Sequence, residues 1–313
     1  MLKRLLSFLN HVHFFSEHQY GFIKGKSTED ALISLTDKIY DSVNNKNKTT
    51  GLFIDFKKAF DLVDHNILLF KLEAAGVRGV ALNWFKSFLV GRSQLVKIQN
   101  CISCPSTVKS GVPQGSVLSA TMFIMFLNGL LKINFHGKIS AFADDVAFFY
   151  SHKDQIVMSE IIQDNLNTLK NWCHINKMQV NVDKTKFINF GFSDFELPAT
   201  LRFHSFSCNL EPCNCQEIQR TSNISYLGVI LDQRLSWENH ITNINNKIRS
   251  SIRSLYFLRN FCNHSLLKTI YYSLINSKIQ YSLVCYGGAN KSLLGKLRLS
   301  QNYFLRVILK RKN

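Results

Sequence analysis

Two adjacent carboxylates, Asp144 and Asp145, stand inside an apolar run that extends from Ala141 to Tyr150. Short apolar runs rich in aromatic residues are typical of buried strands, and two ionised side chains in such a run are costly to bury without a nearby cation. Hard cations such as Mg²⁺ take oxygen ligands, so the pair predicts a divalent-metal site at a strand-turn-strand junction. The alternative is a plain hairpin tip, because aspartate is a favoured turn residue.

A third acid, Asp55, lies near the end of the apolar segment 51–56, which is typical of a buried strand. The carboxyl end of a strand is where open α/β sheets place ligand-binding side chains, and a buried aspartate that caps the next helix is the alternative. Carboxylates from two strands are what two-metal nucleotidyl transfer requires. In that chemistry two Mg²⁺ ions about 3.5–4 Å apart activate a primer 3′-hydroxyl and stabilise the leaving pyrophosphate.

Two loops have the composition of ligand-binding turns. Residues 110–116 are rich in Gly and Pro and precede an apolar helix expected over 117–131, and such a turn lets the backbone approach a ligand closely. Lys24 and Lys26 precede a helix expected over 29–43, and a helix N-terminus suits phosphate groups. A solvated basic loop is the alternative for the two lysines.

The charge of the chain predicts a polyanionic partner. Its 313 residues include 38 Lys and Arg against 21 Asp and Glu, which gives a formal net charge of +17. Nucleic acid is favoured over an anionic membrane because the basic residues are spread along the whole chain. The most apolar stretch, 117–131, is shorter than the roughly 20 residues that a bilayer requires, and no cleavage site of a secretion signal follows the first residues.

Eight cysteines are scattered along the chain, unlike the dense framework of a secreted disulfide protein. Reduced thiols and an intracellular location, nuclear or cytoplasmic, are therefore expected. Cys101 and Cys104 could form half of a zinc site, to which Cys208, Cys213 and Cys215 could add thiolates, but the spacings match no ribbon or knuckle pattern. Zinc is the less favoured interpretation, because free cysteine usually behaves as a small apolar residue.

The remaining elements are predicted from periodicity and turn composition. Helices are expected over 2–15, from Phe60 to Gly76, over 80–90 and over 153–176, a hairpin over 94–108, and strands within 181–190 and over 226–232, whereas 44–50 and 203–220 are expected to be irregular. From about Trp237 the chain is helical and basic, which predicts a subdomain boundary near 232–240. The mixture predicts an α+β fold, and the hydrophobic fraction of 46% provides ample material for a core.

Seven motifs occur in an order that resembles the reverse transcriptase domain of non-LTR (LINE-type, jockey-like) retrotransposons. They are residues 19–32, 55–61, 110–119, 142–145, 181–185, 226–232 and 237–241. Each motif alone is weakly specific, whereas seven in the family's order cover nearly the whole chain. The resemblance implies a right-hand polymerase fold in which a palm with an antiparallel sheet and packed helices is joined to partial fingers and a helical thumb.

The resemblance also divides the chain. Residues 1–50 would be partial fingers, 51–232 the palm with the remaining fingers elements, and 233–313 the thumb. The strands that precede the first helix in the family, and an endonuclease domain, are not in the sequence, so a truncated copy is expected.

Roles for individual residues follow from the matched motifs. Asp55 and Asp144 would be the principal ligands of two Mg²⁺ ions, or of Mn²⁺, with Asp145 as the accessory acid and the carbonyl of Phe56 as a further ligand. Phe60 matches the bulky residue that excludes a ribose 2′-hydroxyl, and Lys184 matches a lysine near the phosphates that could protonate pyrophosphate. The nucleotide pocket would also include Gln114, Gly115, Lys24 and Lys26, and the primer and template would contact Tyr226, Leu227, Gly228, Arg249 and Arg253.

The expected activity is RNA-directed DNA synthesis, with an RNA template, a DNA primer and dNTPs as partners. The sequence departs from the family at Ile23, where an arginine usually meets the triphosphate, and at Ala120 and Gly129, where Pro and Asp are usual. Lys24 or Lys26 would replace that arginine less well, because lysine lacks a bidentate fork. The alternatives are a degenerate copy that only binds RNA or DNA, and an interaction protein whose acids are caps and turns.

Overall fold

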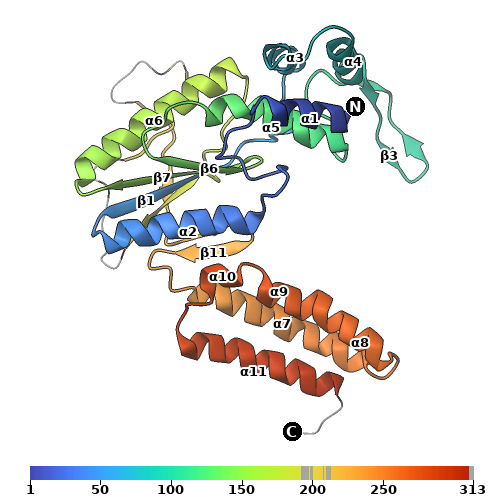
Figure 1. The fold of residues 1–313 in the computed structure, drawn as a ribbon, viewed down its shortest axis with the longest axis vertical. Helices are drawn as coiled ribbons and strands as arrows, with labels where there is room; N and C mark the ends of the chain where they lie inside the picture. The colour runs from blue at the N-terminus through green and yellow to red at the C-terminus, as the bar shows by residue number, and fades with distance from the viewer. Residues whose placement is uncertain (192–196, 198–199, 207, 209–212, 310–313) are drawn as a thin grey trace.

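The computed structural model describes residues 1–191, 197, 200–206, 208 and 213–309, except for the side chain of Arg253, and a five-stranded sheet lies at its centre (Figure 1). The strands are β1 (Lys48–Ile54), β6 (Lys138–Phe142), β7 (Asp145–His152), β8 (Lys186–Phe190) and β9 (Gln219–Arg220). Their order is β6-β7-β1-β8-β9, and every pair is antiparallel except β8 with β9. The parallel pair was not predicted, and it forms because the long connection after β8 returns to the start of that strand.

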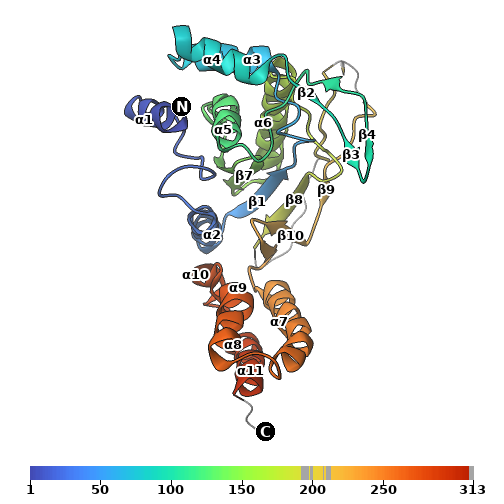
Figure 2. The ribbon, with the colours of Figure 1, turned by 90° about the vertical axis from the view of Figure 1, so that its right-hand side faces the viewer.

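Both faces of the sheet are buried, which explains the nearly continuous apolar runs of β1 and β7. Along β1, Leu52 and Ile54 belong to one hydrophobic core and Phe53 to the other. One face is covered by α5 (Val117–Leu131) and α6 (Gln155–Ile175). The other is covered by α2 (Thr28–Asn44) and by the hairpin of β10 (Asn223–Tyr226) and β11 (Val229–Asp232) (Figure 2).

The apolar helix α5 is enclosed on nearly all sides, because α3 packs against it and the sheet lies below it. Around it lie α1 (Leu2–His11), α3 (His65–Ala74) and α4 (Gly79–Leu89). One exposed hairpin follows α4, as predicted over 94–108. At its base β2 (Ser93–Gln94) pairs with β5 (Ser106–Thr107), and at its tip β3 (Lys97–Ile98) pairs with β4 (Cys101–Ile102). Among the described residues, no helix is long and apolar enough to cross a bilayer.

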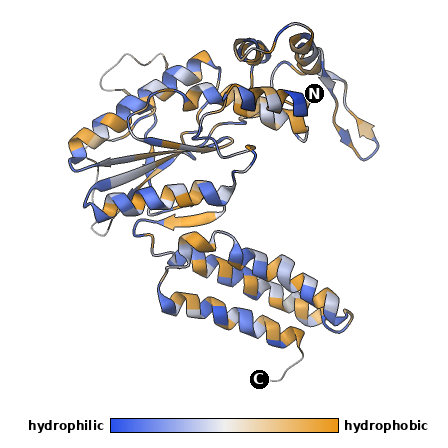
Figure 3. Ribbon diagram, viewed as in Figure 1, coloured by the Kyte–Doolittle hydropathy of each residue, from blue (hydrophilic) through white to orange (hydrophobic). Residues whose placement is uncertain are grey.

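From residue 238 to residue 309, the end of the described chain, all regular elements are helical. They are α7 (Glu238–Leu258), α8 (His264–Tyr271), η1 (Tyr272–Asn276), α9 (Ser277–Gln280), α10 (Leu283–Tyr286) and α11 (Lys291–Ile308). Hydrophobic and hydrophilic residues alternate in bands along α7 and α11 (Figure 3), which pack against each other through their apolar sides. Trp237 is buried at the junction with the sheet and shares a hydrophobic core with Leu32 and Leu35 of α2.

Three boundaries differ from the sequence prediction. The helix expected from Phe60 begins at His65, because the carboxylate of Asp64 caps it by accepting the N–H groups of Asn66 and Ile67 at 3.0 Å. The first helix ends at His11 instead of residue 15, and β1 begins at Lys48 within the expected polar bridge.

The expected strand over 226–232 is a hairpin. Leu227 and Gly228 form its turn with φ angles of 45° and 80°, which is the pattern of a two-residue turn between antiparallel strands. The helices predicted over 29–43, 80–90, 117–131 and 153–176 are confirmed to within a few residues.

Candidate active site

Asp144 and Asp145 lie at the tip of the hairpin formed by β6 and β7. Phe142 at the end of β6 pairs with Asp145 at the start of β7, so Ala143 and Asp144 form a two-residue turn. Ala143 has a φ of 55°, a left-handed conformation that such turns require and that alanine rarely adopts. The predicted strand-turn-strand junction is confirmed, and its backbone needs support from outside the hairpin.

Asp55 lies beside this turn because β1 pairs with β7. In the antiparallel register Ile54 is opposite Val146, and continuation by one residue places Asp55 opposite Asp145. Directly opposite residues share a face of the sheet, with Cβ atoms about 4.5–5.5 Å apart. Since Asp55 alternates with Ile54 along the chain, the two aspartates are on the side covered by α2 and the β10–β11 hairpin.

The three carboxylates influence one another electrostatically. Partial burial, together with the charges of Asp144 and Asp55, raises the pKa of Asp145 to about 6. Partial burial and the charge of Asp55 also raise the pKa of Asp144. In the part of the chain that the structure describes, no ion pair joins any of the three to a lysine or arginine. A cluster of carboxylates that forms no ion pair fits a site for hard divalent cations.

The buried side chain of Gln19 supports the acidic turn. Its segment pairs with β6, since the backbone N–H of Tyr20 donates to the carbonyl of Ala141 at 2.8 Å. The Gln19 Oε1 atom then accepts two backbone hydrogen bonds, from Ala143 at 3.0 Å and from Gly21 at 2.8 Å. The left-handed residue before Asp144 is therefore held by a side chain from the N-terminal loop.

Gly21 lets that loop touch the turn. A Cβ atom at this position would lie 2.4 Å from the backbone nitrogen of Ala143 and 3.0 Å from the carbonyl carbon of Phe142. Both neighbours are backbone atoms that cannot move aside without displacing the turn. Only glycine fits there, which gives a physical reason for the residue after Tyr20.

The turn that precedes β8 lies on the other side of Asp55. The N–H of Asp55 donates to Thr185 Oγ1 at 3.2 Å, and its carbonyl accepts the N–H of Asn181 at 2.7 Å. Lys184 is exposed on this turn, close in sequence to both partners. Successive carbonyls of an extended chain point in opposite directions, so the carbonyl of Phe56 faces away from this turn and toward the side of β7.

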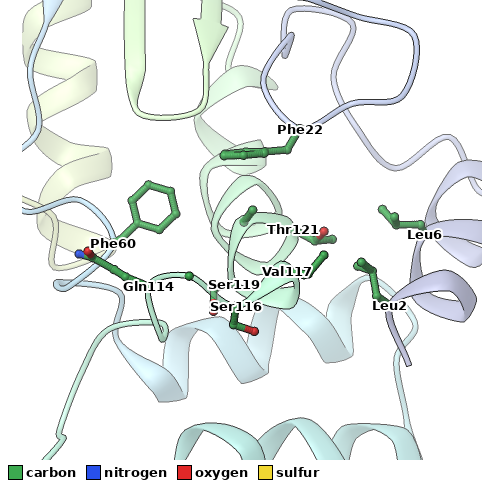
Figure 4. A pocket seen from close by; sticks show the side chains of 11 residues that line it. Leu2, Leu6, Phe22, Phe60, Gln114, Ser116, Val117, Ser119 and Thr121 are labelled. Carbon is green, nitrogen blue, oxygen red and sulfur yellow. The ribbon is translucent and has the colours of Figure 1, made fainter. Parts of the chain in front are cut away.

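Phe60 and Gln114 lie on one side of a cavity of about 640 Å³, Leu2 and Leu6 lie on the other, and Phe22 lies between the two sides (Figure 4). Residues 115–117 and 119–121 of the following turn and helix also line it. Phe60 stacks on Phe123 of α5 with ring centroids 4.2 Å apart. The side-chain amide of Gln114 donates to the carboxylate of Asp61 at 2.8 Å. The cavity therefore has a fixed aromatic wall and one polar corner.

The Gly-rich turn is fixed against the segment that carries Phe60. The N–H of Val112 donates to the carbonyl of Phe60 at 2.9 Å, and the N–H of Gly111 donates to that of Val63 at 2.8 Å. A Cβ atom at Gly111, whose φ is 90°, would lie 2.9 Å from the Cα of Asp61. The prediction of a turn with fixed geometry is confirmed, and its close backbone contact is with Asp61; a close approach to a ligand stays a prediction.

The two N-terminal lysines differ in their surroundings. The Lys26 ammonium donates to the carbonyls of Glu17 and, at 2.9 Å, of Gln19. It also lies 4.8 Å from the centre of the Tyr20 ring. Lys26 therefore fastens the Gln19 loop, whereas Lys24 is exposed.

Tyr226 lies between the β10–β11 hairpin and the sheet. Its buried ring contacts that of Phe53 with centroids 5.1 Å apart, and burial raises its pKa, with the charge of Asp145 as a further cause. The hydroxyl of Tyr281, after α9, donates to the carbonyl of Leu227 at 2.5 Å. The turn residues Leu227 and Gly228 are thus held by the C-terminal helices and lie on the acidic side of the sheet.

The C-terminal helices are strongly basic. The sequence after Asp232 holds 14 Lys and Arg against a single acid, Glu238. Arg249 is exposed on α7 and lines a groove against α11 with Tyr256 and Tyr303, so the structure does not bring it together with the three carboxylates. The backbone of Arg253 belongs to the same helix, and its side chain lies outside the described residues.

The sequence model of the family described as "Reverse transcriptase (RNA-dependent DNA polymerase)" matches residues 1–231. The chain belongs to the reverse transcriptase family. It is 27% identical over 97% of its length to the probable RNA-directed DNA polymerase from transposon X-element of Drosophila melanogaster, and 29% identical over 98% to that from transposon BS of the same organism. It covers 33% and 34% of these relatives, so it spans about a third of their length.

The fold also resembles that of solved telomerases. The structure of telomerase from Candida albicans in complex with a TWJ fragment of telomeric RNA aligns with 97% of this reverse transcriptase chain and 46% of that chain, at a TM-score of 0.53 and 12% identity. Telomerase from Candida tropicalis, solved without ligand and without its C-terminal domain, aligns with 74% of the chain at a TM-score of 0.51. At these identities the likeness shows the right-hand polymerase fold alone.

Some residues around the carboxylates were given no role by the sequence. Gln19, Gly21 and Thr185 all occur in the motifs of the reverse transcriptase family, but the motifs do not show what these side chains contact. Tyr281 lies outside every motif. A glutamine and a glycine two residues apart in a loop do not by themselves indicate that the loop supports a distant turn. The contacts of Gln19 and Gly21 with the acidic turn are therefore identified by the structure alone.

Proposed function

We propose that the chain carries out RNA-directed DNA synthesis by two-metal nucleotidyl transfer from a dNTP to a primer 3′-hydroxyl. The observation that carries the proposal is the convergence of three acids where two interior strands meet: Asp55 follows β1 and lies beside the β6–β7 turn of Asp144 and Asp145, which the N-terminal loop supports. The reverse transcriptase family is divalent-metal-dependent in general, and three mutually repelling carboxylates fit that requirement.

Asp55 and Asp144 are proposed as the principal metal ligands, with Asp145 as the accessory acid and the carbonyl of Phe56 as a further ligand. Two Mg²⁺ ions, or Mn²⁺, would supply Lewis-acid stabilisation of the attacking and leaving oxygens. Phe56 supports this assignment because its carbonyl faces the side of β7 on which the acids lie. The position of the acids at the end of β1 supports the placement of that chemistry there.

The wall of the cavity is proposed to select the sugar of the nucleotide. Phe60 is held by its stack on Phe123 and so presents a rigid face, against which a ribose 2′-hydroxyl would collide. Gln114 and Gly115 would line the same pocket. Lys24 would contact the triphosphate from the exposed part of the loop, and Lys26 would act by holding that loop in place.

Lys184 is proposed to deliver a proton to the leaving pyrophosphate. Its turn is joined to Asp55 by two hydrogen bonds, so the ammonium group is carried by the same backbone that carries the metal ligand. An exposed ammonium group can approach a phosphate without first breaking an ion pair.

The RNA template and DNA primer are proposed to lie along the basic helices. Residues 1–50 would serve as partial fingers, 51–232 as the palm and 233–313 as the thumb, with the Tyr226-Leu227-Gly228 turn against the primer and Arg249 and Arg253 near the duplex. The excess of positive charge after Asp232 supports this arrangement, since neutralisation of phosphates dominates affinity for nucleic acid.

Primer extension on an RNA template with dNTPs and Mg²⁺ tests the proposal. The matched pair of variants is Asp55→Asn and Asp164→Asn, because Asp164 is an exposed acid on α6. Loss of metal ligation is expected to cost several kcal/mol of transition-state stabilisation, so Asp55→Asn should lower the rate by about 10²-fold or more. Asp164→Asn should leave the rate unchanged. Equal activity of the wild type and Asp55→Asn would overturn the proposal, and salt-sensitive RNA binding without synthesis would support a binding role instead.

A further inference from the structure

Four potential soft-metal ligands meet in the connection between β8 and β9. His204, Cys208, Cys213 and Cys215 bring one nitrogen and three sulfur atoms within 4.8 Å of one another. The His204 Nδ1 atom lies 3.7 Å from Cys208 Sγ and 3.3 Å from Cys213 Sγ. All four side chains are partly buried.

We propose that these four residues form a structural zinc site of the Cys₃His type. Tetrahedral Zn²⁺ binds sulfur at about 2.3 Å and nitrogen at about 2.0–2.1 Å, so neighbouring nitrogen and sulfur ligands are about 3.6 Å apart. The two nitrogen-sulfur distances around His204 lie on either side of that value. Small side-chain rotations therefore suffice to close the tetrahedron.

The donor set selects the metal. Thiolates and imidazole favour zinc over Mg²⁺, which takes oxygen ligands, so this site is chemically distinct from the three aspartates. Four protein ligands leave no open position, which is characteristic of a structural and not a catalytic zinc site. The proposal does not depend on the polymerase activity.

In the sequence the ligands lie between two antiparallel segments, 201–203 and 216–218, which are called the arms here and are already joined by hydrogen bonds. The N–H of Phe203 donates to the carbonyl of Gln216 at 3.1 Å, and that of Ile218 donates to Leu201 at 2.9 Å. An ion pair between Arg202 and Glu217, with 2.9 Å between Nη2 and Oε1, joins the arms. His204 and Cys215 lie directly beyond the Phe203–Gln216 pair, at the ends of the two arms, where a metal would hold the arms together.

Two further contacts resemble the outer interactions of zinc sites. The backbone N–H of Ser205 points at the sulfur of Cys215 at 3.4 Å, and N–H donors to ligand sulfur orient and stabilise a thiolate. The guanidinium group of Arg202 donates to the carbonyl of Cys213 at 3.2 Å, which fixes the backbone that carries another ligand.

The proposed zinc would hold the connection against the palm-like sheet. The side-chain amide of Gln216 donates to the carboxylate of Asp183, the residue before Lys184. Beyond the opposite arm, Phe206 stacks on His174 of α6 with ring centroids 3.5 Å apart. Metal binding to such a loop contributes to folding, so the zinc would order the arms and, through Gln216, the turn that carries Lys184.

The test is metal binding by the whole chain, with Zn²⁺ and Co²⁺ alone as probes. Protein purified with zinc and then dialysed is expected to retain about one equivalent of zinc, and Co²⁺ substitution is expected to give the intense absorption of tetrahedral thiolate coordination. The double variant Cys213→Ser/Cys215→Ser should lose the zinc and this spectrum. The matched control is Cys101→Ser/Cys104→Ser, which removes two exposed thiols outside the cluster and should keep both.

His204→Cys guards against a variant that fails to fold. It should retain the metal as a Cys₄ site and increase the sulfur-to-cobalt charge-transfer absorption, a change that a purely structural role of His204 would not produce. The proposal is overturned if wild-type protein shows no thiolate-cobalt spectrum, if the cluster variant retains as much zinc as the control, or if mass spectrometry finds a disulfide between two cysteines of the cluster.

Discussion

The Oε1 atom of Gln19 accepts a hydrogen bond from the backbone N–H of Ala143 at 3.0 Å, although 124 residues separate them. Ala143 is the left-handed residue that turns the chain immediately before Asp144. A turn residue with an unfavourable φ persists only where its surroundings over-determine it. The N-terminal loop therefore shapes the acidic turn, although none of the three carboxylates of the site comes from it.

Gln19→Ala is expected to destabilise the fold and to lower polymerase activity. The N–H groups of Gly21 and Ala143 would lose their acceptor in a buried place, at a cost of about 1–3 kcal/mol for each unpaired group. Urea unfolding and primer extension measure the two effects. Gln163→Ala is the matched control, because Gln163 also accepts a backbone N–H, that of Arg202 at 3.1 Å, and lies on α6, which covers the opposite face of the sheet from Asp55 and Asp145. Equal losses of activity in both variants would argue against a role for Gln19 in the turn.

Gly21→Ala should damage the same turn by a steric route. Its Cβ atom would lie 2.4 Å from the nitrogen of Ala143, and overpacking against backbone costs about 1–3 kcal/mol. Gly295→Ala is the control, since a Cβ there meets nothing within 4 Å and α11 should gain about 0.5–1 kcal/mol from the better helix former. Thermal unfolding and primer extension of both variants provide the measurement. An active and stable Gly21→Ala protein would contradict the close contact.

The sequence was sufficient to predict the class of fold and the position of the acids at strand ends, whereas their role as metal ligands stays a prediction. Carboxylates inside apolar runs are informative because burial of an unpaired charge costs free energy. Asp55 and Asp144 stand in such runs, and this signal can be read from the local sequence alone. The helix over 117–131 was predicted correctly because an apolar run of fifteen residues that follows a Gly-rich turn is too long for a strand and favours a helix.

Other features depend on contacts that no local pattern encodes. The sequence suggested thiolates from Cys208, Cys213 and Cys215 but grouped them with Cys101 and Cys104 and missed His204, because the spacing is irregular and the four residues meet only through the pairing of residues 201–203 with 216–218. The sequence placed the start of this helix at Phe60 and not at His65, because Phe60 fits the same helical face as residues 67, 68 and 72. In the structure the carbonyl of Phe60 instead accepts the N–H of Val112 in the Gly-rich turn. In both cases tertiary contacts override the local signal.

Asp145→Asn is expected to stabilise the metal-free protein while it impairs catalysis. Removal of one of three mutually repelling carboxylates relieves repulsion, and because Asp145 is partly exposed the gain should be about 1 kcal/mol or less. The rise in Tm caused by Mg²⁺ or Mn²⁺ should shrink in the variant. Thermal unfolding with EDTA and with each metal gives both numbers. Asp164→Asn serves as the control, and a metal-free Asp145→Asn protein less stable than wild type would be inconsistent with the repulsion.

The junction with the C-terminal helices should be sensitive to acid. His240 is buried, and burial, followed by the charge of Lys247, lowers its pKa to about 4 from the ordinary 6.5. The unfolded chain therefore binds the proton more readily, so stability present above about pH 6.5 is lost as the pH falls toward about 4, by about 3 kcal/mol in all.

His240→Gln should remove that loss, because the amide cannot be protonated and can still accept the N–H of Ile230, which lies 3.4 Å from Nδ1. Chemical unfolding at a series of pH values measures it. His264→Gln, at an exposed position at the start of α8, should keep the acid sensitivity of the wild type. The same pH profile in all three proteins would show that His240 is not the source.

Phe60→Ala is expected to relax discrimination against ribonucleotides. The ring lies 4.2 Å from that of Phe123 and forms the wall of the cavity beside Gln114, so its removal opens space where a 2′-hydroxyl would otherwise collide. A steric exclusion of this kind is lost with the ring, whereas synthesis from dNTPs should continue because no metal ligand changes. The measurement is the ratio of kcat/KM for a dNTP to that for the matching ribonucleotide. Phe88→Ala, which removes a ring stacked on Trp84 away from the cavity, controls for lost packing. A ratio unchanged in an active Phe60→Ala enzyme would show that sugar selection lies elsewhere in the pocket.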